Sequence, residues 1–441
     1  MRHIIFIYFL AIFSIFGQDG FKYNSKKRKI VVPIKIIDNL IFVPINVNGV
    51  ELNLLLDTGV EETILFSLEE QEEEVSFKNV ETIKLKGLGK ADYIEALKST
   101  NNPLKINNSF IDNNHELYII LDQKFNISSH IGIPVNGIIG YKFFKNSIVE
   151  INYIKKKLII HRDYSKIQKK LIKRYSKIEI SIEKNKPYIT TKLSLNNNEI
   201  KAKLLLDIGN ADAIWLFDAN NNNIEIPENN FDDYLGRGFS GEIYGKRAKL
   251  DVLKFNEYEF KNLYVAFPDS VSVQSAKMVK NRVGSVGAEI TRRFSIFIDY
   301  TKEIIYLKKN LNYYNPFNFN MSGLDFQHDG LQWVQEMVYL QTNKSQASGY
   351  GGIEISLNPY KYKFELKPKY SIFNVRKGSP AALSGIKKGD ILLTINGKKA
   401  YYFTLQEISA LLKSEENKQI VLEIERNSQV YKFSFFLKNI I

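Results

Sequence analysis

The segment Leu54-Leu55-Leu56-Asp57-Thr58-Gly59 decides how this chain is interpreted, because it recurs 150 residues later as Leu204-Leu205-Leu206-Asp207-Ile208-Gly209. In both copies a run of three leucines ends in an aspartate, and a glycine follows two residues later. A second pair of matching segments comes further along, Gly137-Ile138-Ile139-Gly140 and Gly284-Ser285-Val286-Gly287, with an offset of 147 residues. Markers that repeat in the same order and register predict two homologous lobes, at residues 30–162 and 175–310.

Both lobes have the sequence pattern of β-structure. Leu40–Val47 and Glu51–Leu56 are short runs of apolar and β-branched residues, and Asn48-Gly49 between them is a tight-turn signal. Lobe 2 repeats this pattern through Tyr188–Leu195 and Ile200–Leu206. No long amphipathic helix is evident in either lobe, so a parallel βαβ sheet is not expected. The predicted fold class is therefore mainly β.

A third unit with one or two helices is predicted at residues 350–441. Gly378-Ser379-Pro380-Ala381-Ala382 indicates a helix start with proline in the first turn. Thr404-Leu405-Gln406-Glu407 has the pattern of a capping box at the start of another helix. Residues 311–349, rich in asparagine and aromatic residues, are a linker, an extension of lobe 2 or the first strand of this third unit.

Composition excludes several classes of function. The 441 residues include no cysteine, so a disulfide scaffold, a cysteine zinc site, an iron–sulfur cluster and a thiol nucleophile are all excluded. Four histidines beyond the N-terminal segment show no ligand spacing, and we expect no metal. The net charge of +13 comes from lysines scattered along the chain, which favours solvated strand faces over nucleic-acid binding.

The N-terminus has the pattern of a secretory signal peptide at residues 1–17. Arg2 and His3 precede an apolar run from Ile4 to Phe16, which is too short to span a bilayer comfortably. An uncleaved membrane anchor is the alternative. The signal peptide predicts an exported protein, periplasmic or extracellular in a bacterium, without stable membrane insertion after cleavage.

The two aspartates are the main candidates for chemistry. A carboxylate at the end of a buried strand is costly unless it is hydrogen-bonded, and two lobes related by a pseudo-two-fold axis would bring Asp57 and Asp207 face to face. Two such carboxylates share one proton, because both cannot ionise at close range. The ionised member can activate a water molecule while the protonated member polarises a carbonyl group. Which aspartate holds the proton does not follow from the sequence.

The paired segments resemble the retropepsin-like and pepsin-like aspartic proteases over residues 30–310. The resemblance implies a catalytic dyad of Asp57 and Asp207, with no cofactor, and an extended peptide or protein as substrate. It also implies supporting residues in the two turns and a mobile flap hairpin in each lobe, which are Thr58, Gly59 and Gly209 for the turns and Gly87, Leu88, Gly89, Gly236 and Gly238 for the flaps. Since both lobes are in one chain, a monomer is expected to form the whole site.

Ile208 departs from the family pattern. In the family, the Thr or Ser after each Asp forms a hydrogen bond across the dyad, and Ile208 has no hydroxyl group. The alternative to an endopeptidase is therefore a non-catalytic peptide-binding or scaffold protein with a degenerate protease core.

The C-terminal unit resembles a PDZ domain of the bacterial kind, most clearly over residues 373–400. The resemblance implies binding of an extended peptide, usually a chain terminus, at a sheet edge. A unit that only packs against the lobes is the alternative. Gly351-Gly352-Ile353 and Phe364-Glu365-Leu366 are both candidates for the carboxylate-binding loop.

Overall fold

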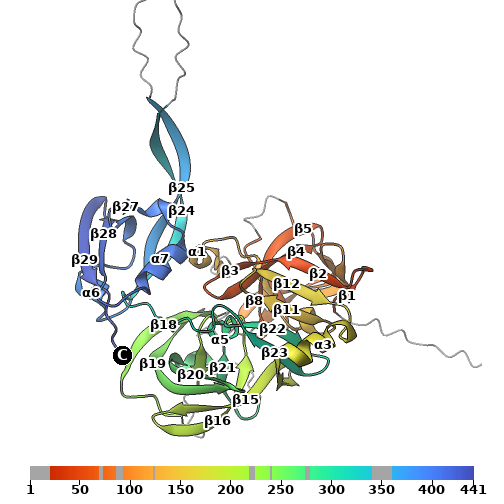
Figure 1. Ribbon diagram of the computed structural model, residues 1–441. Helices are drawn as coiled ribbons and strands as arrows, with labels where there is room; N and C mark the ends of the chain where they lie inside the picture. The colour runs from red at the N-terminus through yellow and green to blue at the C-terminus, as the bar shows by residue number, and fades with distance from the viewer. Residues whose placement is uncertain are drawn as a thin grey trace, which may run out of the picture.

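A computed structural model describes residues 20–68, 73–85, 93–122, 125–217, 224–238, 241–273, 279–339 and 360–441. The protein is mainly β, and it consists of two lobes and a C-terminal unit with two short α-helices (Figure 1). The predicted fold class is therefore confirmed. The predicted signal peptide, residues 1–17, lies outside the described residues. Within the described ranges, no helix is long and apolar enough to cross a membrane.

Lobe 1 is built on a nine-stranded sheet in which the strand order is β1-β9-β6-β10-β5-β4-β8-β7, with β3 paired to β4. The strands are β1 (Lys22–Tyr23), β3 (Lys35–Ile37), β4 (Leu40–Val47), β5 (Val50–Leu56), β6 (Thr63–Leu65), β7 (Val80–Leu85), β8 (Ile94–Ile106), β9 (Phe110–Ile120) and β10 (Gly137–Ile139). Two one-turn helices, α1 (Ser128–Ile131) and α2 (Tyr141–Phe144), flank β10 in the sequence.

Lobe 2 is built on an eight-stranded sheet in the order β14-β15-β16-β21-β17-β20-β19-β18. The strands are β14 (Ser181–Glu183), β15 (Lys186–Leu195), β16 (Asn198–Leu206), β17 (Ile214–Leu216), β18 (Asn230–Gly238), β19 (Gly241–Phe255), β20 (Tyr258–Pro268) and β21 (Arg282–Val286), with α4 (Ser270–Val273) and α5 (Ala288–Thr291).

The two lobes share the same strand pairing next to the aspartates. In lobe 1, β10 lies parallel to β5 and antiparallel to β6. In lobe 2, β21 lies in the same way between β16 and β17. The second apolar segment of each repeat therefore lies between the strand that precedes the aspartate and the strand that follows it.

A six-stranded sheet joins the lobes, in the order β13-β23-β22-β11-β12-β2. Its strands are β2 (Lys29–Pro33), β11 (Ile148–Asn152), β12 (Lys157–His161), β13 (Ser176–Glu179), β22 (Phe294–Asp299) and β23 (Ile304–Lys309), and α3 (Ser165–Arg174) connects the halves. The segment Ile30–Ile37 is divided between this sheet and lobe 1, because the chain leaves β2 after Pro33 and enters β3 at Lys35. β11 pairs antiparallel with β22, so equivalent strands meet at the centre.

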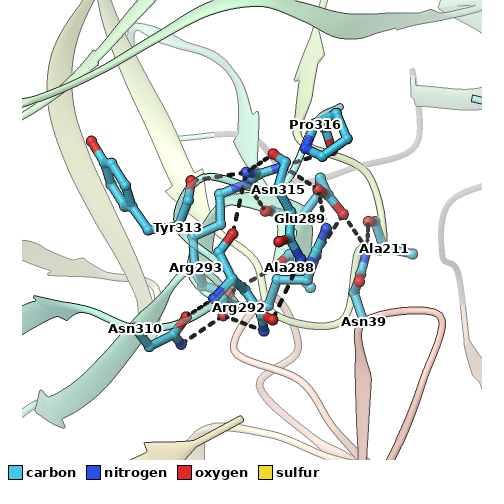
Figure 2. A network of polar contacts seen from close by, with 12 residues as sticks. Asn39, Ala211, Ala288, Glu289, Arg292, Arg293, Asn310, Tyr313, Asn315 and Pro316 are labelled. Carbon is cyan, nitrogen blue, oxygen red and sulfur yellow. Dashed lines mark hydrogen bonds and ion pairs between the residues drawn. The ribbon is translucent and has the colours of Figure 1, made fainter. Parts of the chain in front are cut away.

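Polar contacts around Glu289 connect lobe 1 to lobe 2 (Figure 2). The Asn39 side-chain amide donates hydrogen bonds to the Ala211 carbonyl at 3.0 Å and to Glu289 Oε2 at 2.8 Å. Arg293 is fully buried beside Glu289, and its guanidinium donates to backbone carbonyls that include that of Tyr313. The segment after β23 is therefore held against lobe 2.

The C-terminal unit begins earlier than residue 350. Its hydrophobic core includes residues from Phe319 to Leu437, and its sheet has the order β24-β25-β26-β28-β29. The elements are β24 (Leu324–Tyr339), β25 (Tyr360–Val375), α6 (Pro380–Leu383), β26 (Ile391–Ile395), β27 (Lys398–Lys399), a 3₁₀ turn (Ala400–Tyr402), α7 (Leu405–Leu412), β28 (Gln419–Arg426) and β29 (Gln429–Phe436). Much of the predicted linker is thus the first strand of this unit. The Thr404–Glu407 capping box forms as predicted.

Candidate active site

Asp57 and Asp207 occupy equivalent places at the ends of β5 and β16. The Asp57 N–H donates to the Ile139 carbonyl at 3.0 Å, and the Asp207 N–H donates to the Val286 carbonyl at 2.9 Å. Both carbonyls belong to the strand that is inserted beside the aspartate strand. The shared apolar segments therefore hold the backbone of both aspartates in the same way.

The structure brings the two carboxylates together. A Cβ atom added to Gly209 would lie 2.2 Å from Cγ of Asp57, and one added to Gly59 would lie 3.0 Å from Cγ of Asp207. Each glycine thus makes room for the carboxylate of the opposite lobe, and any larger residue at 209 would collide with Asp57. The Gly59 N–H also donates to Asp57 Oδ1 at 2.6 Å.

The environment makes the two aspartates unequal. Burial raises the pKa of Asp57 well above its usual value, and the charge of Asp207 raises it further. Burial also raises the pKa of Asp207, but the positive charge of Arg282 and a hydrogen bond with Asp57 oppose that rise. The positive charge of Arg282 therefore favours the ionised form of Asp207, whereas the charge of Asp207 disfavours the ionisation of Asp57.

Thr58 connects the two turns across the lobe boundary. Its hydroxyl group donates to the Leu206 carbonyl at 2.6 Å and accepts from the Ile208 N–H at 3.1 Å. Both partners are backbone groups, so Thr58 does not need a hydroxyl group at residue 208. The Ile208 side chain is fully buried in the core that the lobes share. In the family pattern, one residue from each turn bonds across the lobes; here Thr58 does so, and the Ile208 side chain does not.

Sequence reasoning missed two residues beside Asp207, Arg282 and Tyr188. The Arg282 guanidinium lies 5.0 Å from the centre of the Phe217 ring, and its Nε donates to the Gly284 carbonyl at 3.0 Å. No ion pair of Arg282 with a carboxylate is found in the described part of the chain. A comparison of the two repeats could have identified Arg282, because the equivalent residue of lobe 1, at the offset of 147, is the apolar Val135.

Each lobe carries a hairpin where a flap was predicted. In lobe 1, β7 pairs with β8, but Gly87, Leu88 and Gly89 lie between them and outside the described residues. In lobe 2, β18 pairs with β19, the register shifts between Tyr234 and Gly236, and Gly238 pairs with Gly241 beside the tip. Gly236 has a φ of +142°, which suits glycine at this irregular position.

One candidate for the carboxylate-binding loop of the C-terminal unit is wrong. Phe364-Glu365-Leu366 lies in the middle of β25 and pairs with β24, so it is strand and not loop. Gly351-Gly352-Ile353 lies outside the described residues. In the turn that leads into β24, the Ser322 and Gly323 N–H groups donate to the Asn320 side-chain oxygen.

A chain of ion pairs connects the C-terminal unit to the turn that follows Asp207. Arg247 on β19 lies 3.0 Å from Asp212 and 2.9 Å from Asp233, measured between charged atoms. Arg376, after β25, lies 3.4 Å from Asp233. Since Arg247 and Arg376 are both buried, the unit is fixed to lobe 2 and not merely tethered to it.

Among the residues that the structure describes, no group of three or more His, Cys, Asp or Glu could hold a metal ion. Residues 372–426 match the family model of the PDZ domain. No curated protein sequence matches the chain. The C-terminal unit is thus a PDZ domain, a class of module that binds peptides.

Proposed function

We propose that the chain is an aspartic-type endopeptidase in which Asp57 and Asp207 form the catalytic dyad. The observation that carries this proposal is the contact between the two carboxylates, which the two equivalent glycines permit at the junction of the lobes. The resemblance of the Asp-Thr-Gly segments to the aspartic proteases supports the same reaction.

In the proposed reaction, water attacks a peptide carbonyl without a covalent intermediate. Asp207, whose ionised form Arg282 favours, removes a proton from a water molecule between the carboxylates. Asp57, which holds the shared proton, donates a hydrogen bond to the carbonyl oxygen and stabilises the negative charge that develops there. The proton from water then passes to the leaving nitrogen, and the dyad regains its starting state.

The substrate is proposed to be an extended peptide or protein segment between the two hairpins, and the PDZ domain is proposed to bind substrate or partner peptides. Export by means of the segment 1–17 is part of the same proposal. The rival function, peptide binding without cleavage, requires the same fold but no reactive dyad.

The test is cleavage of a quenched fluorescent peptide library by the full chain between pH 3 and pH 8. We expect activity in the wild type and a loss of at least about a thousandfold in both Asp57→Asn and Asp207→Asn. Activity that survives both substitutions would exclude the dyad mechanism, and a wild type with no cleavage would favour the scaffold function.

Thermal unfolding shows whether the inactive variants are folded, and it tests the burial of the dyad independently. Folding raises the pKa of Asp57. Once the pH exceeds the pKa that this carboxyl group has in the unfolded state, its ionisation there favours unfolding. Asp57→Asn removes this effect. We expect a higher unfolding temperature than the wild type at pH 7 and an equal one near pH 3, where Asp57 is protonated in both states.

A further inference from the structure

In the PDZ domain α7 lies against β24, and we call the unpaired edge of β24 beside α7 the groove. In the described part of the chain β24 is an edge strand, because it pairs with β25 on one side and with no strand on the other. α7 lies beside it, and its first residue, Leu405, packs into the core of the domain. An edge strand next to a helix offers unpaired backbone groups and an apolar wall, which are what an extended peptide needs in order to bind.

A segment of lobe 1 lies against this part of the PDZ domain. Helix α1 contacts β24 and lies next to α7 (Figure 1). The Gln406 side-chain amide donates to the Ile131 carbonyl at 3.0 Å. A Cβ atom added to Gly132 would lie 3.2 Å from Cδ1 of Leu405. Residues 128–132 therefore occupy space that a bound peptide would need.

One buried polar atom in this contact lacks a hydrogen-bond partner among the described residues. His130 packs against the Phe373 ring with 4.5 Å between ring centres, yet its Nδ1 atom is buried and has no hydrogen-bond partner among the described residues. Burial lowers the pKa of His130 to about 4, so its imidazole is neutral in the docked state at neutral pH. A buried polar atom without a partner costs free energy, and exposure of this segment to water would remove that cost.

The same segment reaches the catalytic face of lobe 1. Ile127, Ile131 and Ile133 pack against the apolar cluster that contains Leu55 and Ile138. Leu55 lies on β5, two residues before Asp57, and it pairs with Ile138 on the neighbouring strand β10. Release of residues 128–132 would therefore loosen packing next to the dyad strand.

The hairpin of lobe 2 touches the PDZ domain at the same place. The Tyr234 ring on β18 lies 5.3 Å from the Phe373 ring, between ring centres. Phe373 thus contacts both His130 of lobe 1 and the hairpin of lobe 2. A shift of the Phe373 ring would therefore alter its packing against both lobes.

We propose that residues 128–132 are an internal occupant of the PDZ groove, and that an extended peptide binds along β24 by displacing them. The peptide pairs its backbone with the free edge of β24, and its apolar side chains replace the contact of Gly132 with Leu405. Binding of a partner peptide is thereby coupled to the packing beside Asp57. The inference concerns binding and does not depend on whether the dyad is catalytic.

The absence of cysteine from the chain allows a clean test by a single engineered disulfide. An added Cβ at Gly132 lies 3.6 Å from Cβ of Leu405, which is within the range of about 3.5–4.5 Å that disulfides require. Gly132→Cys with Leu405→Cys can therefore lock the segment in the groove when oxidised and release it when reduced. Gly132 has a left-handed φ of +82°, so a cysteine there is strained, but the two redox forms carry the same substitutions and are compared with each other. Gln406→Ala acts in the opposite direction, because it removes the hydrogen bond that holds the segment.

The probe is a fluorescein-labelled decapeptide selected from a random library on the full-length Gln406→Ala variant. All proteins carry Asp207→Asn so that the probe stays intact, and affinity is measured by fluorescence anisotropy. We expect the oxidised lock to bind at least tenfold more weakly than its reduced form, and Gln406→Ala to bind several-fold more tightly than the parent. Gln419→Ala is the matched control, since the Gln419 amide bonds to Ser434 in the same domain away from the groove; its affinity should not change.

Hydrogen exchange locates the bound probe. The β24 amides should exchange more slowly with the probe bound, and the amides of residues 128–132 should exchange faster. Equal affinity of the oxidised and reduced locks, protection outside β24, or failure of the library to yield any binder would each overturn the proposal.

Discussion

The two lobes have the same connectivity around the aspartates but differ in the side chains that surround them. The strand partner of Leu55 is Phe42, whereas the strand partner of Leu205 is Tyr188. Val135 in lobe 1 is likewise replaced by Arg282 in lobe 2. The charge of Arg282 acts on Asp207, whereas that of Lys186 acts on both aspartates. The repeated turn thus provides two equivalent acids, and the divergence of their neighbours places these acids in different electrostatic environments.

A second difference concerns how the turns hold each other. Thr58 of lobe 1 makes both of its hydrogen bonds to the backbone of lobe 2, while Ile208 of lobe 2 contributes only apolar packing. Besides the hydrogen bond between the two aspartates, the side-chain hydrogen bonding between the turns in the described part of the chain comes from Thr58. The following predictions test this asymmetry.

The largest effect is expected from Thr58→Val. The substitution keeps the shape of the side chain but leaves the Leu206 carbonyl and the Ile208 N–H without their partner. Buried groups that lose a partner cost about 1–3 kcal/mol each, so we expect a lower urea midpoint of unfolding. Cleavage activity should fall at least about tenfold, because the carboxylates lose their alignment. Thr58→Ser retains the hydroxyl group and should restore most of both properties; equal loss in both variants would contradict the role of the hydrogen bonds.

The repeat predicted much of this arrangement because it is a pattern in sequence. Leu54–Leu56 and Leu204–Leu206 predicted strands with an aspartate at the end of each, and these strands are present as β5 and β16. The meeting of the carboxylates could be inferred only through symmetry. The family resemblance implied that Thr58 bonds across the dyad, but its partners could not be predicted from side-chain identity, since they are backbone atoms that every residue possesses.

The position of the PDZ domain was beyond sequence reasoning for a related reason. Its contacts join residues far apart in the chain, such as Gln406 with Ile131 and Arg376 with Asp233. No periodicity or motif marks these pairs. The internal pattern of the domain predicted its helix caps correctly, but its first strand is only one of three interpretations of residues 311–349, because Asp329-Gly330 interrupts that strand with a turn signal.

The next largest effect is expected from Arg282→Met, which removes the cation beside Asp207. Burial raises the pKa of Asp207 and Arg282 opposes this rise, so loss of Arg282 should raise that pKa. Since Asp207 must be ionised to act as the base, the acidic limb of the pH profile of kcat/KM should move to higher pH. Activity near pH 4 should fall several-fold, with little change on the alkaline side. Arg282→Lys keeps the charge and should keep the limb in place; an unchanged profile for Arg282→Met would contradict this assignment.

A smaller effect separates the equivalent tyrosines that follow β11 and β22. The Tyr153 hydroxyl group is 3.0 Å from Oγ1 of Thr291, whereas the buried Tyr300 hydroxyl group has no hydrogen-bond partner in the described part of the chain. Tyr153→Phe should therefore reduce the free energy of unfolding by about 1 kcal/mol. Tyr300→Phe should leave it unchanged or slightly higher. Urea denaturation of the two variants side by side measures the difference, and an equal cost for both would show that the lobes do not differ here.

The smallest effect is expected from Ile208→Thr, which gives lobe 2 the residue that lobe 1 has. A hydroxyl group at this position can bond to the backbone of the opposite turn as Thr58 does, for a gain of about 1 kcal/mol. The loss of a buried methyl group costs a similar amount, because Ile208 is fully buried. We therefore expect unchanged or slightly improved kcat/KM and a stability close to that of the wild type. Ile208→Val removes a methyl group without adding a hydroxyl group, and it should be less stable than Ile208→Thr. A loss of most of the activity in Ile208→Thr would contradict this expectation. It would show that the site requires an apolar residue at 208 and a hydroxyl group from Thr58 alone.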